Sequence, residues 1–153
     1  MIPNAMVGRP FPPPTHPAFE WLHGRQLAGA AIADLTAPAP HKLDLPASGP
    51  IIWATTHHGQ AIVGGASSVW PDHSAELRGW LAAHDRPFSE PGFVPLLEGY
   101  GTRYLLLHMH SPHAGSALVE AAQNERLHRV GCFAGPAGPS PWSYPICVLE
   151  IVA

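Results

Sequence analysis

Three histidines fall within six positions of RYLLLHMHSPHAGSALVEAA, which covers residues 103–122. They are His108, His110 and His113. Imidazole nitrogens bind divalent metals, and three of them with one open coordination position are typical of a catalytic zinc site. A neutral imidazole also accepts or donates a proton near neutral pH, which suits acid–base catalysis. The stretch therefore predicts a metal site, with zinc as the favoured ion, or a metal-free acid–base site.

The sequence around these histidines predicts the end of a strand followed by the start of a helix. Residues 103–110 form an apolar run, and strand side chains alternate between faces, so His108 and His110 share one face. Ser111 before a proline is typical of a helix N-cap with proline at the first helical position. His113 then lies in the first helical turn, where it can complete a three-nitrogen group.

Ser111, Gly115 and Ser116 are the expected substrate-binding residues at this junction. The first N–H groups of a helix lack intrahelical partners, and the helix dipole favours an anion there. Gly115 would let a ligand approach the backbone closely. In this interpretation His110 and His113 transfer protons while the helix start binds an anionic group of a small molecule.

Further metal ligands could come from elsewhere in the chain. His57 and His58 lie in an expected hairpin turn, and the available carboxylates are those of Asp72, Glu76, Glu98 and Glu120. The pattern H-x-H-x-x-H lacks the aspartate of the familiar metallohydrolase run and the third alternating histidine of the nucleotide-hydrolysing His-triad pattern, so it resembles neither. With 11 histidines in 153 residues, the alternative is a group of ordinary structural histidines.

The chain divides by composition into two segments. Residues 1–49 are rich in proline and are expected to form an extended N-terminal arm and connector, with a short helix within 18–28. Residues 50–153 are expected to form a single α+β domain.

The expected elements of this domain follow from hydrophobic periodicity and turn residues. Strands are expected at 51–55, 61–69, 93–97, 103–110 and within 144–153, and helices at 71–85 and 112–129. From residue 61 onward this order predicts a ferredoxin-like split βαβ fold, with two helices on one face of an antiparallel sheet and a preceding β-hairpin. A small three-layer α/β fold is the alternative, because Cys132 and Phe133 could add another strand.

Composition limits the partners and the compartment. The net charge is -3 and the eight basic residues are scattered, which argues against nucleic acid as a partner. No apolar run reaches the roughly 18 residues that a membrane span needs, and no signal-peptide pattern begins the sequence. A cytoplasmic protein is therefore expected, with Cys132 and Cys147 as free thiols, neither disulfide-bonded nor metal-bound. Charged residues make up only 12%, which together with sheet edges indicates a homo-oligomer.

Two functions remain open from the sequence. The first is a small cytoplasmic enzyme that uses the histidine cluster, with or without a divalent metal, for hydrolytic or proton-transfer chemistry on a small anionic molecule. The second is a non-catalytic binding or assembly protein, in which the proline-rich arm and Trp142 contact a neighbouring chain. The enzyme requires that His108, His110 and His113 converge in a pocket.

Overall fold

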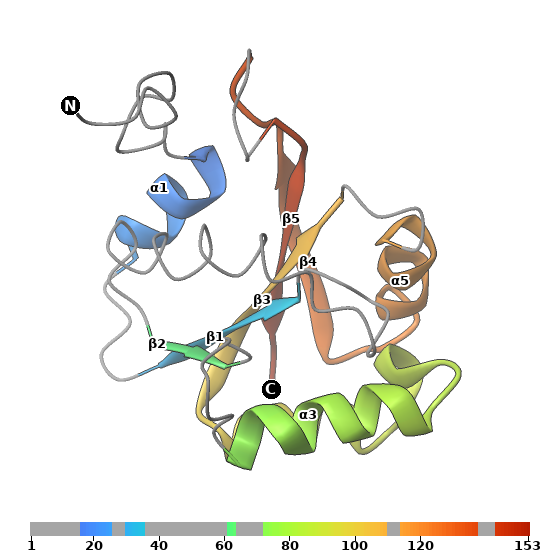
Figure 1. Ribbon diagram of the computed structural model, residues 1–153. Coiled ribbons are helices and arrows are strands. Elements are labelled where there is room, and N and C mark those ends of the chain that lie inside the picture. The colour runs from blue at the N-terminus through green and yellow to red at the C-terminus, as the bar shows by residue number, and fades with distance from the viewer. Residues whose placement is uncertain (1–15, 26–29, 36–60, 64–71, 110–113, 138–142) are drawn as a thin grey trace, which may run out of the picture.

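A computed structural model of the chain describes residues 16–25, 30–35, 61–63, 72–109, 114–137 and 143–153. Among these residues, five strands form one mixed sheet with helices on both faces (Figure 1). The elements in chain order are α1 (Pro17–His23), β1 (Ala31–Leu35), β2 (Ala61–Val63), α3 (Asp72–Ala83), the 3₁₀ helix η2 (Pro87–Ser89), α4 (Phe93–Gly99), β3 (Thr102–His108), α5 (Ala114–Ala121), β4 (Leu127–Phe133) and β5 (Ile146–Ile151).

The strand order is β2-β1-β3-β5-β4, with β3 in the middle. Strand β1 runs parallel to both β2 and β3, whereas β5 runs antiparallel to β3 and β4. The sequence of β3, TRYLLLH, is buried at every position except Arg103. Such a nearly continuous apolar run is typical of a strand that is covered on both faces.

The segment from β3 to β5 forms a split βαβ unit. Strands β3 and β4 are joined through α5, and β5 lies between them, antiparallel to both. On the other side of β3, the parallel strands β1 and β2 complete the sheet. The predicted mixed α+β class is confirmed, but the strand order differs from the ferredoxin-like one because two parallel strands stand beside β3.

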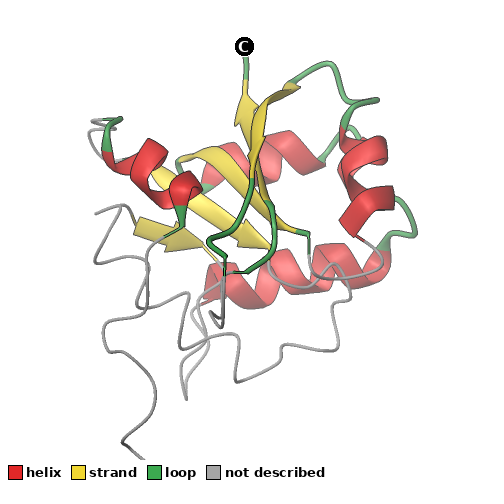
Figure 2. Cartoon of the chain, turned by 90° about the horizontal axis from the view of Figure 1, so that it is seen from above, coloured by secondary structure: helices red, strands yellow, loops and turns green. Residues whose placement is uncertain are grey.

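Helices cover both faces of the sheet, whereas the ferredoxin-like prediction placed them on one face (Figure 2). In this respect the structure resembles the three-layer alternative. Helix α1 covers the first face through Ala18, Phe19 and Leu22. These side chains pack on sheet residues Ile32, Tyr104, Leu106, Ile146 and Val148. We call this layer the α1 face.

The opposite face packs against α3, η2, α4 and α5, and we call it the four-helix face. Its helical core residues are Leu77, Leu81, Phe88, Phe93, Val94, Leu97, Ala117 and Ala121. Its sheet residues are Ala31, Ala33, Leu105, Leu107, Leu127, Cys147 and Leu149. This face holds the larger of the two apolar clusters.

The predicted helix over 71–85 corresponds to α3, which ends at Ala83, the predicted strand over 103–110 corresponds to β3, which ends at His108, and the strand predicted within 144–153 is β5. The predicted strand over 93–97 is wrong, because these residues belong to helix α4. Proline is compatible with that helix because Pro95 is its third residue, where the backbone N–H needs no intrahelical partner.

The predicted helix over 112–129 is too long. Helix α5 ends at Ala121, and Leu127–Phe133 form strand β4. Asn124 stabilises the turn between them, because its side-chain oxygen accepts from the Arg126 N–H at 3.1 Å and its side-chain nitrogen donates to the Phe88 carbonyl at 2.9 Å. This side chain competes with helix continuation, as asparagine commonly does.

The segment 1–49 contributes to the sheet, which the sequence did not predict. Strand β1 pairs with both β2 and β3, and the short helix expected within 18–28 is α1. The predicted strand over 61–69 is described at 61–63, where it pairs in parallel with β1. Its predicted hairpin partner over 51–55 lies outside the described residues.

Candidate functional site

The first residue of the predicted site, His108, ends strand β3 and is buried, with 1% of its surface exposed. Tyr104 and Leu106 belong to the α1 face, whereas Leu105 and Leu107 belong to the four-helix face. The predicted alternation of side chains is therefore confirmed along β3, and it places His108 on the α1 face.

The remaining predicted residues are described only in part. His110, Ser111 and His113 lie outside the described residues, as do His57 and His58. Gly115 and Ser116 occupy the first turn of α5 and are exposed. A Cβ atom built on Gly115 meets nothing within 4 Å, so the described chain itself leaves room for a larger residue there.

The ring of His108 contacts Tyr144, which comes shortly before β5. The Nδ1 atom of His108 and the Tyr144 hydroxyl lie 2.8 Å apart, within hydrogen-bond distance. The next residue, Pro145, accepts a hydrogen bond at 2.9 Å from the backbone N–H of Met109. The segment before β5 is therefore tied to the end of β3 by a side-chain and a backbone contact.

A second buried histidine, His16, contacts the same tyrosine. It is 0% exposed and caps helix α1, because its Nδ1 accepts from the Ala18 N–H at 3.1 Å. Its Nε2 lies 2.9 Å from the Tyr144 carbonyl oxygen. Since Nδ1 is the acceptor, Nε2 carries the proton and donates to this carbonyl. His16, His108 and Tyr144 form one group, which we call the histidine–tyrosine cluster.

Burial favours the neutral form of His16. Desolvation lowers its pKa, and the nearby His108 lowers it further, because two imidazolium ions would repel each other. The Tyr144 carbonyl and Glu20 oppose this lowering. The neutral form that the hydrogen bonds require is thus also the form that burial favours.

The sequence did not single out His16 or Tyr144. A signal for His16 was present, because Pro17 directly after it is typical of the first helical position and makes residue 16 a cap. Tyr144 had no comparable signal. Its role depends on how the residues before β5 pass the end of β3, which strand pairing determines.

No group of three or more possible metal ligands occurs among the described residues. Among the described residues, three of the four carboxylates that the sequence offered as further ligands contact other groups. Glu76 binds the Tyr100 hydroxyl, Glu98 binds the Arg126 guanidinium, and Glu120 accepts from the Ser89 N–H at 3.1 Å. A metal site with three such ligands would therefore need at least one residue outside the described ones, such as those at 110–113 or 57–58.

The position of His108 in the sheet is typical of ligand sites in α/β proteins. Strands β1, β2 and β3 are parallel, so their carboxyl ends lie at the same edge of the sheet. From β1 the chain continues to β2 on one side, and from β3 it continues to α5 and β4 on the other. Ligands commonly bind outside the carboxyl ends of parallel strands where such connections diverge.

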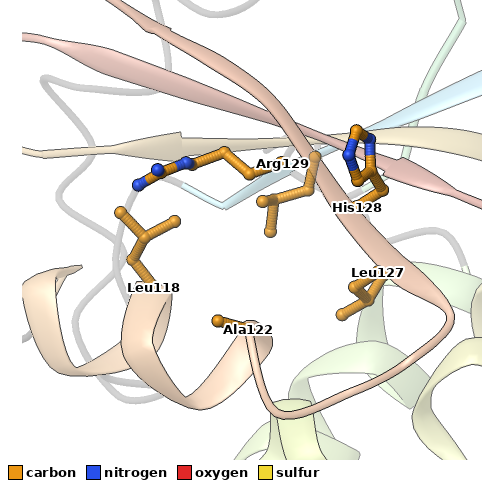
Figure 3. A pocket seen from close by; sticks show the side chains of 6 residues that line it. Leu118, Ala122, Leu127, His128 and Arg129 are labelled. Atoms are coloured by element: carbon orange, nitrogen blue, oxygen red, sulfur yellow. The ribbon is translucent and has the colours of Figure 1, made fainter.

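A pocket of about 390 Å³ lies elsewhere, between α5 and β4 (Figure 3). Its apolar lining consists of Leu118, Ala122, Leu127 and Leu149. His128 and Arg129 complete the lining, and both are exposed. Figure 3 shows the Arg129 side chain extending from β4 toward Leu118 of α5. The pocket thus combines an apolar surface with one cationic group.

The expectation of free thiols is wrong. Cys132 and Cys147 form a disulfide with an S–S distance of 2.04 Å. They are register partners in the antiparallel β4–β5 pair, which brings their sulfur atoms together. The prediction of free thiols rested on the expected cytoplasmic setting, which does not depend on how close the two cysteines lie in the sheet.

Among the described residues, no helix is long and apolar enough to span a membrane. Trp142, considered above as a contact for a partner chain, lies outside them. Comparison of the chain with protein-family models, with curated proteins and with solved structures finds no match.

Proposed function

We propose that the protein is a small-molecule enzyme whose histidines transfer protons at the carboxyl ends of β1 and β3. The observation that supports this most is the place of His108, at the end of β3 where the connections of two adjacent parallel strands diverge. The residues that follow His108 in the chain are the predicted site residues His110, Ser111 and His113.

The roles follow from the chemistry of each side chain. His110 and His113 act as the proton-transfer groups, and Ser111, Gly115 and Ser116 bind an anionic group of the substrate near the start of α5. His108 is a positioning residue in the metal-free form, with its ring bonded to Tyr144. In the metal-bound form His108, His110 and His113 hold a divalent ion, zinc for preference.

The test is a panel of chromogenic carboxyl esters, phosphate esters and keto–enol substrates. Wild type is compared with His113→Gln, His110→Gln and a control, His128→Gln, in which an exposed histidine of β4 is removed. We expect a loss of about 10²- to 10⁴-fold in kcat/KM for the first two variants. Absence of turnover by the wild type, or equal activity of all variants, contradicts the proposal.

Elemental analysis of tag-free protein separates the metal-bound form from the metal-free form. Near-stoichiometric zinc that is lost in the His108→Ala/His110→Ala double variant supports the metal-bound form. The control is His84→Ala/His128→Ala, which should retain the metal. Absence of metal after soaking the wild type contradicts the metal-bound form and leaves the acid–base proposal in place.

The sequence predicted a cytoplasmic location and a homo-oligomer. The disulfide argues against the first, because stable disulfides belong mainly to oxidising compartments, and cytoplasmic ones are usually transient or redox-sensing. The position of β4 at one end of the described sheet supports the second, since end strands present backbone groups for pairing. Light scattering during size-exclusion chromatography measures the oligomeric state.

The pocket between α5 and β4 favours a second candidate function, the binding of a small carboxylate with an aliphatic body. Its leucines suit the aliphatic part, and Arg129 has no ion-pair partner among the described residues, so its charge is available to a carboxylate.

Octanoate is a suitable probe for this candidate. It should raise the Tm of the wild type and of Arg129→Lys, and it should have little effect on Arg129→Gln. Octan-1-ol, which lacks the charge, should have a weaker effect than octanoate. Equal effects of octanoate on the wild type and Arg129→Gln contradict this candidate.

A further inference from the structure

The proposed function does not use the disulfide between β4 and β5. Cys132 and Cys147 are register partners, with Cα atoms 3.9 Å apart. Cys132 is exposed and lies on β4, the last strand on this side of the described sheet. Cys147 is 1% exposed and belongs to the apolar core of the four-helix face. The two cysteines therefore differ strongly in their access to solvent.

The connection closed by this disulfide carries Tyr144. The two cysteines are 15 residues apart, and Tyr144 lies three positions before Cys147. Through its carbonyl oxygen Tyr144 accepts from His16, and through its hydroxyl it contacts His108. The disulfide thus closes the same loop that holds both histidines of the histidine–tyrosine cluster.

We propose that Cys132–Cys147 is a thiol-exchange site for a dithiol reductant, and that its reduction loosens the hold of Tyr144 on His16 and His108. The attacked sulfur is that of Cys132. This inference goes beyond the proposed function and does not depend on it. The redox state of Cys132 and Cys147 and the state of the histidine–tyrosine cluster can both be measured without any substrate.

The exchange proceeds in two balanced steps. A thiolate of the dithiol attacks Cys132 Sγ, the Sγ–Sγ bond breaks, and Cys147 leaves as a thiolate that takes up a proton. The second thiolate of the dithiol then attacks its own sulfur in the mixed disulfide and releases Cys132 as a thiolate, which is protonated in turn. The protein disulfide gains two electrons and two protons, and the dithiol becomes a disulfide.

Access decides which sulfur is attacked, because the incoming thiolate must reach the sulfur along the line of the disulfide bond. A reagent can reach exposed Cys132, whereas the apolar core surrounds Cys147. After reduction the backbone pairing of β4 with β5 remains. The loop that carries Tyr144 then loses its covalent tie, and its ends are held by the backbone pairing of Phe133 with Ile146 without the support of the disulfide.

Trapping experiments on the full chain test the site of attack. The folded protein is exposed to reduced glutathione, quenched with acid and mapped by mass spectrometry. We expect the glutathione adduct on Cys132 to exceed that on Cys147 by about tenfold or more. Equal adducts, an excess on Cys147, or a disulfide that dithiothreitol does not reduce in the folded protein overturns the proposal.

Imidazole NMR spectra before and after reduction by dithiothreitol test the effect on the cluster. We expect the signals of His16 and His108 to shift or broaden on reduction and to recover on reoxidation, with a fall in Tm on the order of 10 °C. His84 is the internal control, because it is bonded to the Trp80 carbonyl on α3. Its signal should stay in place.

A Cys132→Ser/Cys147→Ser variant completes the test. It should give His16 and His108 signals like those of the reduced protein and should not respond to dithiothreitol. If this variant does not fold, reduction and reoxidation of the wild type carry the same information. Unchanged His16 and His108 signals after complete reduction overturn the proposal. A simultaneous loss of the His84 signal also overturns it, because this indicates global unfolding.

Discussion

The two faces of the sheet differ in size and in the polarity of what they bury. The four-helix face packs apolar side chains from α3, η2, α4 and α5 against the sheet. The α1 face has one seven-residue helix, and two buried histidines, His16 and His108, lie beside its smaller apolar cluster. Buried histidines need hydrogen-bond partners, and both find one on Tyr144.

This difference indicates a division of tasks between the faces. The larger apolar cluster buries more surface and supplies more of the hydrophobic stabilisation. The α1 face holds polar groups whose arrangement depends on a few specific hydrogen bonds. Substitutions on the four-helix face should therefore act mainly through packing, and those on the α1 face through polar contacts as well.

The largest effect is expected from neighbouring leucines of β3 that point to opposite faces. Leu105 and Leu106 are both 0% exposed. Leu105→Ala should lower the free energy of unfolding by about 3–5 kcal/mol, and Leu106→Ala by about 2–3 kcal/mol, because a single short helix can settle into the space left behind. Urea unfolding measures both values. A larger loss for Leu106→Ala would mean that the α1 face packs more rigidly than the opposite one.

The next effect concerns the polar contacts of the α1 face. His16→Ala removes a helix cap and a donor to the Tyr144 carbonyl, and should lower the free energy of unfolding by about 2–3 kcal/mol. His16 has a lowered pKa in the folded state, so the unfolded state binds its proton more readily. Stability should therefore be fully present above about pH 6.5 and should fall as the pH drops below this value.

The control for this pH dependence is His16→Asn, because asparagine can cap a helix but does not titrate. Thermal unfolding should be measured at a series of pH values. Over about one to two pH units below pH 6.5, where histidine titrates, this variant should lose less Tm than the wild type. Parallel curves for the two proteins would show that His16 does not titrate differently in the folded state.

On the four-helix face, a glycine tests how tightly the helices pack. A Cβ atom added to Gly92 would lie 2.6 Å from Cη2 of Trp80, whose ring stacks on His84 at a centroid distance of 4.0 Å. Gly92→Ala should cost about 1–3 kcal/mol, because the ring must move. Gly99→Ala, which meets nothing within 4 Å, is the matched control and should be close to neutral. Calorimetry that finds both variants neutral would mean that Trp80 moves freely.

The smallest effect separates helix propensity from ligand binding. Gly79 in α3 and Gly115 in α5 are both exposed, with nothing within 4 Å of an added Cβ. Each change to alanine should raise the free energy of unfolding by up to about 1 kcal/mol. If a ligand approaches the backbone at the start of α5, Gly115→Ala alone should also reduce substrate turnover. Equal turnover in both variants would remove Gly115 from the proposed site.

Sequence patterns predicted the elements that carry a continuous apolar run or apolar residues at helical spacing. The apolar run of β3 and the spacing of Leu77 and Leu81 in α3 led to the correct elements. Three elements did not follow such a pattern. Helix α4 has a proline in its first turn, and the residues just before β4 are compatible with a helix. Strand β1 is a short apolar stretch between proline-rich segments. Pairing with distant strands decides the fate of such short segments.

For the candidate site, the local pattern of β3 was predictable, whereas the contacts between distant residues were not. The alternation along β3 gave the correct face for His108, whereas the contact with Tyr144 depends on β5 pairing with β3. His16 could be placed only once α1 was known to cover the same face. Contacts between residues more than a hundred positions apart leave no local pattern in a single sequence.

The pairing of β1 with β3 also affects how the protein is made. Ile32 is paired with Tyr104, so about seventy further residues must be synthesised before the main partner of β1 leaves the ribosome. At about 5–20 residues per second this takes several seconds. Meanwhile Phe19 and Leu22 of the nascent chain have no sheet to cover. A chain with such distant contacts folds late, and α1 and β1 remain accessible to a chaperone during this delay.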